Sequence, residues 1–161
     1  MSNDFLDLQI GVDIVDNRTT DDHYTPAFIF ESLKLTFDID VAAPIGGVPW
    51  IPTKKYYTLL DDGLNSAWHG LIWCNPPYSK ITPWALKMLQ HGNGIALLPV
   101  GKSQWFDLLW KKADGICGLP SSLRFIKSDQ TVAGIMTTTC LFSFGKLATE
   151  ALIDSNLGKV R

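Results

Sequence analysis

The segment Leu71-Ile72-Trp73-Cys74-Asn75-Pro76-Pro77-Tyr78 decides the fold prediction, because four apolar residues run directly into a stiff polar turn. The apolar run is typical of a buried strand. Two adjacent prolines have fixed φ angles and no N–H groups, so a loop must follow the strand. The Asn75 amide oxygen and the Pro76 carbonyl can both accept from one NH2 group, and Tyr78 offers a ring for stacking. The segment predicts a strand-end site for a planar group with an exposed amine.

Strand and helix patterns alternate around this segment. Hydroxyl residues and prolines predict helix starts at Thr25-Pro26, with Thr25 as the cap, and at Thr82-Pro83, with Thr82 as the cap; Gly92 predicts a helix stop. The alternation favours an α/β fold with a mostly parallel sheet and helices on both faces, whose ligands bind at the carboxyl ends of the strands. The predicted helices are residues 26–35, 82–92, 103–113 and 146–156. The predicted strands are residues 37–41, 56–60, 71–74, 94–100, 115–118, 122–126 and 134–144, the last as either one long strand or two, and residues 42–53 are a predicted loop.

Composition indicates one globular domain. The 161 residues are 46% hydrophobic and 19% charged, enough for a single core. We expect a weakly ordered arm at residues 1–20 and one domain over residues 21–161. No apolar run reaches the length of a membrane span, and the polar first residues do not resemble a secretion signal. We therefore expect a cytoplasmic protein that does not bind membranes.

The three cysteines are widely separated and odd in number, which favours reduced core thiols. They are Cys74, Cys117 and Cys140, and no histidine lies at ligand spacing from them, so no metal site is expected.

Several stretches of the chain, in order, resemble the phage-type DNA adenine-N6 methyltransferases, small enzymes that share the Asn-Pro-Pro-Tyr motif. This resemblance implies a single-domain, Rossmann-like class I methyltransferase fold, with a mostly parallel sheet and an antiparallel C-terminal strand. It also implies S-adenosylmethionine as cofactor, double-stranded DNA as partner and, if the chain is phage-encoded, the host cytoplasm as location. The matching stretches are Tyr24-Thr25-Pro26, Phe37-Asp38-Ile39-Asp40-Val41-Ala42-Ala43, Asp62-Gly63-Leu64 with Trp68, Trp73-Cys74-Asn75-Pro76-Pro77-Tyr78-Ser79, Leu97-Leu98-Pro99 and Leu123-Arg124-Phe125.

The resemblance assigns roles to individual residues. The catalytic set is Asn75, Pro76, Pro77 and Tyr78: the Asn75 oxygen and the Pro76 carbonyl hold the target amine, and Tyr78 stacks on a base flipped out of the duplex. The cofactor-binding set is Tyr24, Thr25, Pro26, Asp40, Val41, Ala42, Asp62 and Asn75. The chain departs from larger methyltransferases in having no Gly-x-Gly after the strand that ends near Asp40.

Simpler interpretations stay open for three of these positions. Asp40 could be a solvent-facing strand residue, Thr25-Pro26 an ordinary helix start, and Asp62 part of an Asp-Gly turn. These alternatives predict no contact with a cofactor.

Net charge of −2 argues against a protein that coats nucleic acid through phosphate contacts alone. A local patch remains compatible with this charge, and we predict nucleic-acid contacts from Tyr78, Lys80, Lys102 and Arg124. For the lysines the alternative is ordinary solubilising charge, and for Arg124 it is a pair with an internal carboxylate.

The leading hypothesis is a DNA adenine-N6 methyltransferase. Asn-Pro-Pro-Tyr also serves methyltransferases that act on RNA bases or on protein glutamine, which gives a second hypothesis. The third is a non-catalytic inhibitor that binds DNA or protein. A homodimer that clamps the duplex is an alternative to a monomer.

Overall fold

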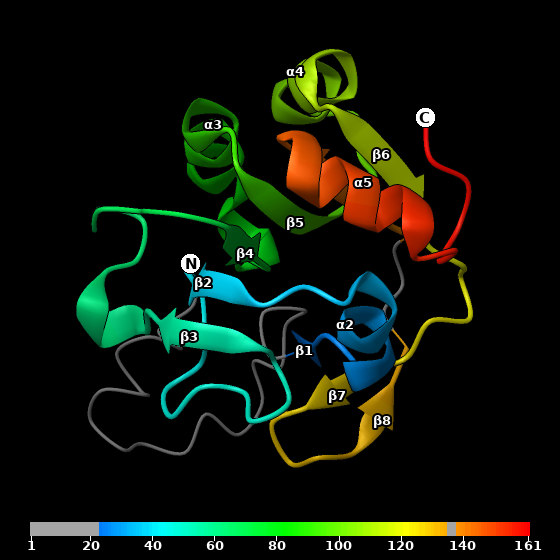
Figure 1. Ribbon diagram of the computed structural model, residues 1–161. Helices are drawn as coiled ribbons and strands as arrows, with labels where there is room; N and C mark the ends of the chain where they lie inside the picture. Colours follow the sequence, from blue (N-terminus) through cyan, green and yellow to red (C-terminus); the bar gives the residue numbers. More distant parts are fainter. Residues whose placement is uncertain (1–22, 135–137) are drawn as a thin grey trace.

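The computed structural model describes residues 23–134 and 138–161, in which six strands form a central sheet and three form a small one (Figure 1). The predicted arm at residues 1–20 lies outside the described residues. The order of the central sheet is β3-β2-β4-β5-β9-β6. Strands β3, β2, β4 and β5 are parallel, whereas β9 is antiparallel to β5 and β6. The strands are β2 (Phe37–Asp40), β3 (Thr53–Tyr56), β4 (Ile72–Cys74), β5 (Gly94–Pro99), β6 (Gly115–Gly118) and β9 (Thr139–Phe144).

Helices cover both faces of this sheet. Helices α2 (Ala27–Leu33) and α5 (Lys146–Asp154) contribute to a core cluster that contains Trp73 and Leu97. Helices α3 (Ile81–His91) and α4 (Gln104–Lys112) contribute to the second cluster, with Ile72 and Leu98. The predicted α/β fold, with its mostly parallel sheet and late antiparallel strand, is confirmed at this level.

The central strands are buried because helices pack on both of their faces. All three residues of β4 and all six of β9 are buried, as are the first five of β5. Parallel strands covered on both sides need apolar residues at every position, so the apolar run at residues 94–100 was an accurate signal.

Two predicted helix starts are displaced. Helix α3 begins at Ile81 after the N-cap residue Lys80, so Thr82 is inside the helix and is not its cap. Helix α2 begins at Ala27 after Pro26, and no side-chain hydrogen bond caps it. Thr25 is therefore not the cap of α2. Its hydroxyl instead accepts a hydrogen bond from the Asn75 amide. The predicted stop at Gly92 is confirmed, because this residue is the C-cap with a φ of 72°.

The strand predicted at residues 56–60 was wrong in position. Strand β3 ends at Tyr56, and a 3₁₀ helix, η2 (Leu59–Asp61), follows. Thr58 and Asp61 explain this: the Thr58 hydroxyl accepts from the Leu60 N–H, and the Asp61 carboxylate accepts from the Thr58 N–H at 2.8 Å. This capping box fixes a helical turn where apolar content alone suggested a strand.

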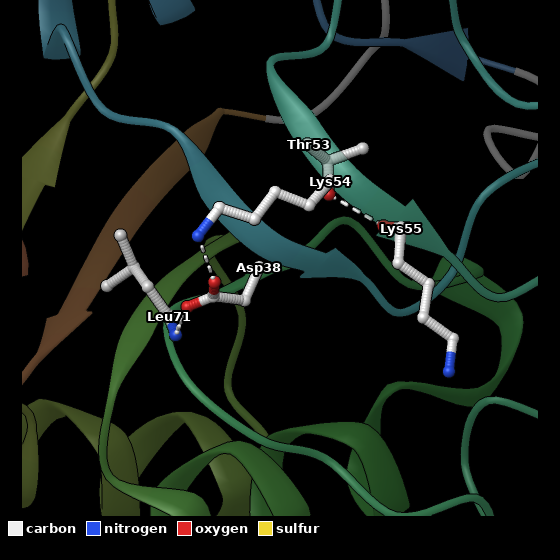
Figure 2. A network of polar contacts seen from close by, with 5 residues as sticks. All are labelled: Asp38, Thr53, Lys54, Lys55 and Leu71. Atoms are coloured by element: carbon white, nitrogen blue, oxygen red, sulfur yellow. Dashed lines mark hydrogen bonds and ion pairs between the residues drawn. The ribbon is translucent and has the colours of Figure 1, made fainter.

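A polar network ties β2 to its two neighbours (Figure 2). Asp38 accepts from the Lys54 ammonium of β3 at 2.9 Å and from the Leu71 N–H before β4 at 2.7 Å. The Leu71 bond, followed by the contact with Lys54, holds the pKa of Asp38 below its usual value. Gly70 has a φ of 70°, and a Cβ there would collide with the Asp38 carboxylate. The network therefore fixes the register of β4 relative to β2 at the point where β4 begins.

The small sheet has the order β1-β7-β8 and lies beside α2 in Figure 1. Its strands are β1 (His23–Tyr24), β7 (Phe125–Lys127) and β8 (Val132–Ala133), and both pairings are antiparallel. The strand predicted at residues 122–126 is therefore shifted toward higher residue numbers. Of the strand predicted at 134–144, residues 139–144 form β9, and residues 135–137 lie outside the described residues.

Candidate active site

The strand order reverses between β2 and β4. The chain passes from β2 to β3 on one side and then returns to β4 on the other side of β2. In open α/β sheets, ligands bind outside the carboxyl ends of the strands at such a reversal. Asp40 ends β2, and Asn75 directly follows β4. The Val41 N–H donates to the Trp73 carbonyl at 3.1 Å, so the two strand ends lie side by side.

The Asn75 amide has a fixed orientation. Its Nδ2 donates to the His23 carbonyl and to the Thr25 hydroxyl, both at 3.3 Å. Because the NH2 group has only two hydrogens and both are used, the amide oxygen Oδ1 must face away from β1. The segment around Thr25 and the loop after β4 are 50 residues apart in sequence, and the fold brings them together at this amide.

The diproline turn leaves a second acceptor beside the first. Pro76 is buried and Pro77 precedes the 3₁₀ helix η3 (Tyr78–Lys80), where the Pro77 carbonyl accepts from the Lys80 N–H at 3.0 Å. Within residues 23–134 and 138–161, no hydrogen bond reaches the Pro76 carbonyl or the Asn75 Oδ1. Two oxygens are therefore available at the end of β4. The Tyr78 ring is half-buried, and its hydroxyl donates to the Leu97 carbonyl of β5 at 3.5 Å.

Asp40 is a buried carboxyl group at the same edge. Its side chain is 3% exposed, so the alternative that it faces solvent is wrong. Burial raises its pKa to about 7, although the Ala42 N–H donates to its Oδ1 at 3.3 Å and acts in the opposite direction. Burial and then the Asp40 charge raise the pKa of the neighbouring Cys74 thiol. A buried carboxyl with one backbone donor is stabilised by an incoming cation.

Asp62 lies on a loop that packs against the end of β2. It has a φ of 51° and accepts from the Asn65 amide at 2.9 Å, which agrees with the turn alternative but does not exclude contact with a ligand. The next residue, Gly63, touches the Val41 backbone so closely that a Cβ would collide with the Val41 carbonyl oxygen. The Asp62 side chain is exposed beside the predicted cofactor site.

Helix α3 holds this loop in place. The Lys87 ammonium donates to the Leu64 carbonyl at 2.7 Å and to the Ser66 carbonyl at 2.5 Å. The same ammonium lies 4.8 Å from the centre of the Trp68 ring, whose Nε1 donates to the Gly63 carbonyl at 2.7 Å. Lys87 and Trp68 are therefore structural supports of the loop that carries Asp62.

Comparison with known proteins gives the family. The family model for the DNA N-6-adenine-methyltransferases (Dam) matches residues 14–146, most of the chain. The chain belongs to this Dam family. It is also 28% identical over 117 residues to the DNA N-6-adenine-methyltransferase of Haemophilus phage HP1 (strain HP1c1). That match covers 65% of the chain and 66% of the relative, just under two thirds of the relative's length.

The matched region of the Dam family includes all the predicted nucleic-acid contacts, and the structure places them at two locations. Lys80 ends η3 and Lys102 follows β5, so both lie near the carboxyl ends of central strands and are exposed. Arg124 precedes β7 of the small sheet and donates to the Ser122 carbonyl at 3.0 Å. The described partners of Arg124 are backbone carbonyls, not the internal carboxylate of the alternative interpretation.

Two supports of the site escaped sequence analysis of this Dam family member. His23 contributes a backbone carbonyl, and a carbonyl leaves no signature in the side-chain pattern. Lys87 resembles any lysine on an exposed helix face, because its partners are 21 and 23 residues away. Only the tertiary fold shows that either residue contacts elements of the candidate site.

The described residues also bear on metals and membranes. In residues 23–134 and 138–161, no three His, Cys, Asp or Glu side chains gather in a way that could hold a metal ion. No helix in these same ranges is long and apolar enough to cross a bilayer.

Proposed function

We propose that this chain transfers a methyl group from S-adenosylmethionine to the exocyclic N6 amine of adenine in double-stranded DNA. Family membership supports DNA adenine methylation as the activity. The observation that carries the residue assignment is the Asn75 amide. Its NH2 group is held by the His23 carbonyl and the Thr25 hydroxyl, so its oxygen is the part of the amide left to accept from a substrate.

The two acceptors suit an adenine amine. The N6 lone pair is delocalised into the ring, which makes the amine a poor nucleophile. The Asn75 Oδ1 and the Pro76 carbonyl each accept one N–H bond, which favours a pyramidal nitrogen and frees the lone pair. Attack then depends mainly on positioning, which a loop locked by two prolines provides. The proton lost by the methylated nitrogen passes to water, so no dedicated base is assigned.

The residues around the strand reversal fit the cofactor. S-adenosylmethionine supplies an electrophilic methyl group when bound. The buried Asp40 carboxyl has a single described backbone donor and no described cation beside it, so it suits the cofactor's ammonium group or ribose hydroxyls. Asp62 would meet the adenine end of the cofactor. The remaining proposed contacts are Tyr24, Thr25, Pro26, Val41 and Ala42, which lie on β1, before α2 and after β2.

The substrate base would be flipped onto Tyr78, whose ring is anchored at β5 by its hydroxyl. Lys80, Lys102 and Arg124 would contact phosphates. We place this reaction in the host cytoplasm, where methylation masks DNA from nucleases.

Labelled S-adenosylmethionine tests the proposal when the full chain is given duplex DNA, RNA and cell protein in separate reactions. Label on DNA adenine is expected. Label confined to RNA or protein would mean that the substrate is RNA or protein and not DNA. Binding of cofactor or DNA without any methyl transfer would indicate an inhibitor.

Asn75→Ala tests the role of the amide. The variant removes an acceptor and leaves Asp40 intact, so we expect transfer to fall at least about 100-fold while cofactor affinity changes little. Calorimetry with S-adenosylhomocysteine measures the affinity. Normal turnover by Asn75→Ala would remove Asn75 from the catalytic set.

A further inference from the structure

The hairpin β7–β8 is a ribbon of two strands within the three-stranded sheet β1-β7-β8, and the proposed reaction assigns no function to it. Phe125 of β7 is 1% exposed. It packs in the core cluster on the α2 side of the sheet and so anchors the base of the ribbon. Beyond this base, Ser128, Gln130 and Thr131 are exposed, and Val132 is 63% exposed. The ribbon therefore has a buried base and a solvent-exposed tip.

The tip of the ribbon is held by its own hydrogen bonds. The Asp129 carboxylate accepts from the Thr131 N–H at 3.0 Å and from its hydroxyl at 2.6 Å. The Gln130 N–H donates to the Lys127 carbonyl at 2.8 Å, and the Lys127 N–H donates to the Thr131 carbonyl at 2.9 Å. The carboxylate is thereby occupied inside the turn, whereas the Gln130 side chain is exposed.

Gln130 has a φ of 67°, in the left-handed region. A glutamine is strained there, and glycine or asparagine would be better suited. Strain of this kind is often retained where the side chain is needed for function. A glutamine amide can bond the N6 and N7 edge of adenine, and the DNA major groove admits a two-stranded ribbon.

The ribbon is joined to the catalytic loop by one short strand. His23 of β1 pairs with Lys127, and Tyr24 pairs with Ile126. The carbonyl of the same His23 accepts from the Asn75 amide. The residue that pairs with Lys127 of the hairpin is therefore the same residue whose carbonyl orients the Asn75 amide.

We propose that the β7–β8 hairpin enters a groove of the duplex beside the target base, with Gln130 reading a base edge and β1 linking the seated hairpin to Asn75. The charges agree with a DNA partner: Arg124 and Lys127 are cationic, and the one carboxylate at the tip, Asp129, is bonded within the turn. This inference rests on the proposed DNA methylation and adds the element that recognises the duplex.

Gln130→Gly is the main test, because glycine favours the observed backbone. We expect this variant to be at least as stable as the wild type while its discrimination between preferred and other sites falls about tenfold or more. Methylation of mixed-sequence duplex DNA, followed by sequencing of the modified sites, measures this. Gln130→Asn, which also tolerates a positive φ, shortens the side chain and should change the preferred sites.

Lys127→Ala should weaken binding of the same duplex several-fold without changing the affinity for S-adenosylhomocysteine. Lys112→Ala is the matched control, because it removes an exposed lysine from α4 on the opposite face of the sheet. In the wild type, the amides of β1 and β7 should exchange hydrogen more slowly when the duplex is bound.

The outcomes separate this inference from the proposed function. If the wild type methylates DNA adenine but Gln130→Gly keeps its site preference and Lys127→Ala keeps its affinity, the hairpin inference is wrong and the function stands. If the wild type methylates only RNA or protein, both are wrong.

Discussion

Thr25 is the residue at which two roles can be separated by kinetics. Its side chain is 1% exposed and its hydroxyl accepts from the Asn75 amide. Thr25→Val keeps the shape but removes this acceptor, so the amide loses one of its two anchors. We expect kcat to fall about 5- to 10-fold, the value of one hydrogen bond, with a smaller change in the KM for the cofactor.

Thr25→Ser is the matched variant because it restores the hydroxyl, and it should recover most of the lost kcat. A large rise in the cofactor KM with unchanged kcat would instead mean that Thr25 contacts the cofactor directly and does not act through Asn75.

Asp40 is the residue whose charge should change near neutral pH. Burial raises its folded pKa from 3.8 to about 7, so the folded protein binds one more proton than the unfolded chain between these values. The free energy of unfolding of the cofactor-free protein should therefore fall as pH rises through this window. Asp40→Asn should remove this dependence and stabilise the protein at pH 8 by roughly 2 to 4 kcal/mol.

Urea unfolding at pH 5 and at pH 8 measures the difference. Asp38→Asn is the control, because the pKa of Asp38 is lowered and its carboxylate is ionised at both values. Asp38→Asn should change the free energy of unfolding by the same amount at pH 5 and at pH 8. An unchanged pH slope in Asp40→Asn would assign the dependence to another group.

At the scale of elements, the sequence correctly predicted the helix ends and strands that depend on local residue chemistry. Gly92 stops α3 because its left-handed φ suits glycine, and the apolar strand before Asn75 is buried as its composition requires. Thr82 was assigned as a cap by residue type alone, but η3 leads directly into α3 through Lys80 and displaces the start. Asp40 was singled out because it ends a predicted strand, and the structure buries it at that strand end, whereas the anchoring of Asn75 by β1 needs a contact across 52 residues.

The support of the Asp62 loop by α3 is a second long-range contact with a measurable effect. Lys87→Met keeps the apolar part of the side chain but removes the donor to Leu64 and Ser66. Hydrogen bonds from a charged donor contribute about 1.5 to 3 kcal/mol, so we expect the free energy of unfolding to fall by up to this amount. The loop should also loosen, with a several-fold weaker affinity for S-adenosylhomocysteine.

Hydrogen exchange of the Asn65 and Ser66 amides, which donate to the Asp62 carbonyl, reports on the loop itself. These amides should exchange faster in Lys87→Met and remain unchanged in Lys112→Met on α4. Unchanged exchange and affinity would show that Lys87 is dispensable for the loop.

At the scale of the whole molecule, a net charge of −2 limits how DNA can be bound. Attraction to phosphates cannot come from overall charge, so it must come from local cations on the surface. Lys80, Lys102, Arg124 and Lys127 are four such residues, and each phosphate contact contributes about −0.9 to the slope of log K against log salt concentration. We expect a slope of about −3 to −4 for the wild type.

Each single substitution of these four residues by alanine should make the slope shallower by about 1, whereas Lys112→Ala should leave it unchanged. Binding of one mixed-sequence duplex at several salt concentrations gives these slopes. A wild-type slope steeper than about −6 would require phosphate contacts beyond these four residues. A slope near zero would mean that base stacking and groove contacts, not phosphates, provide the affinity.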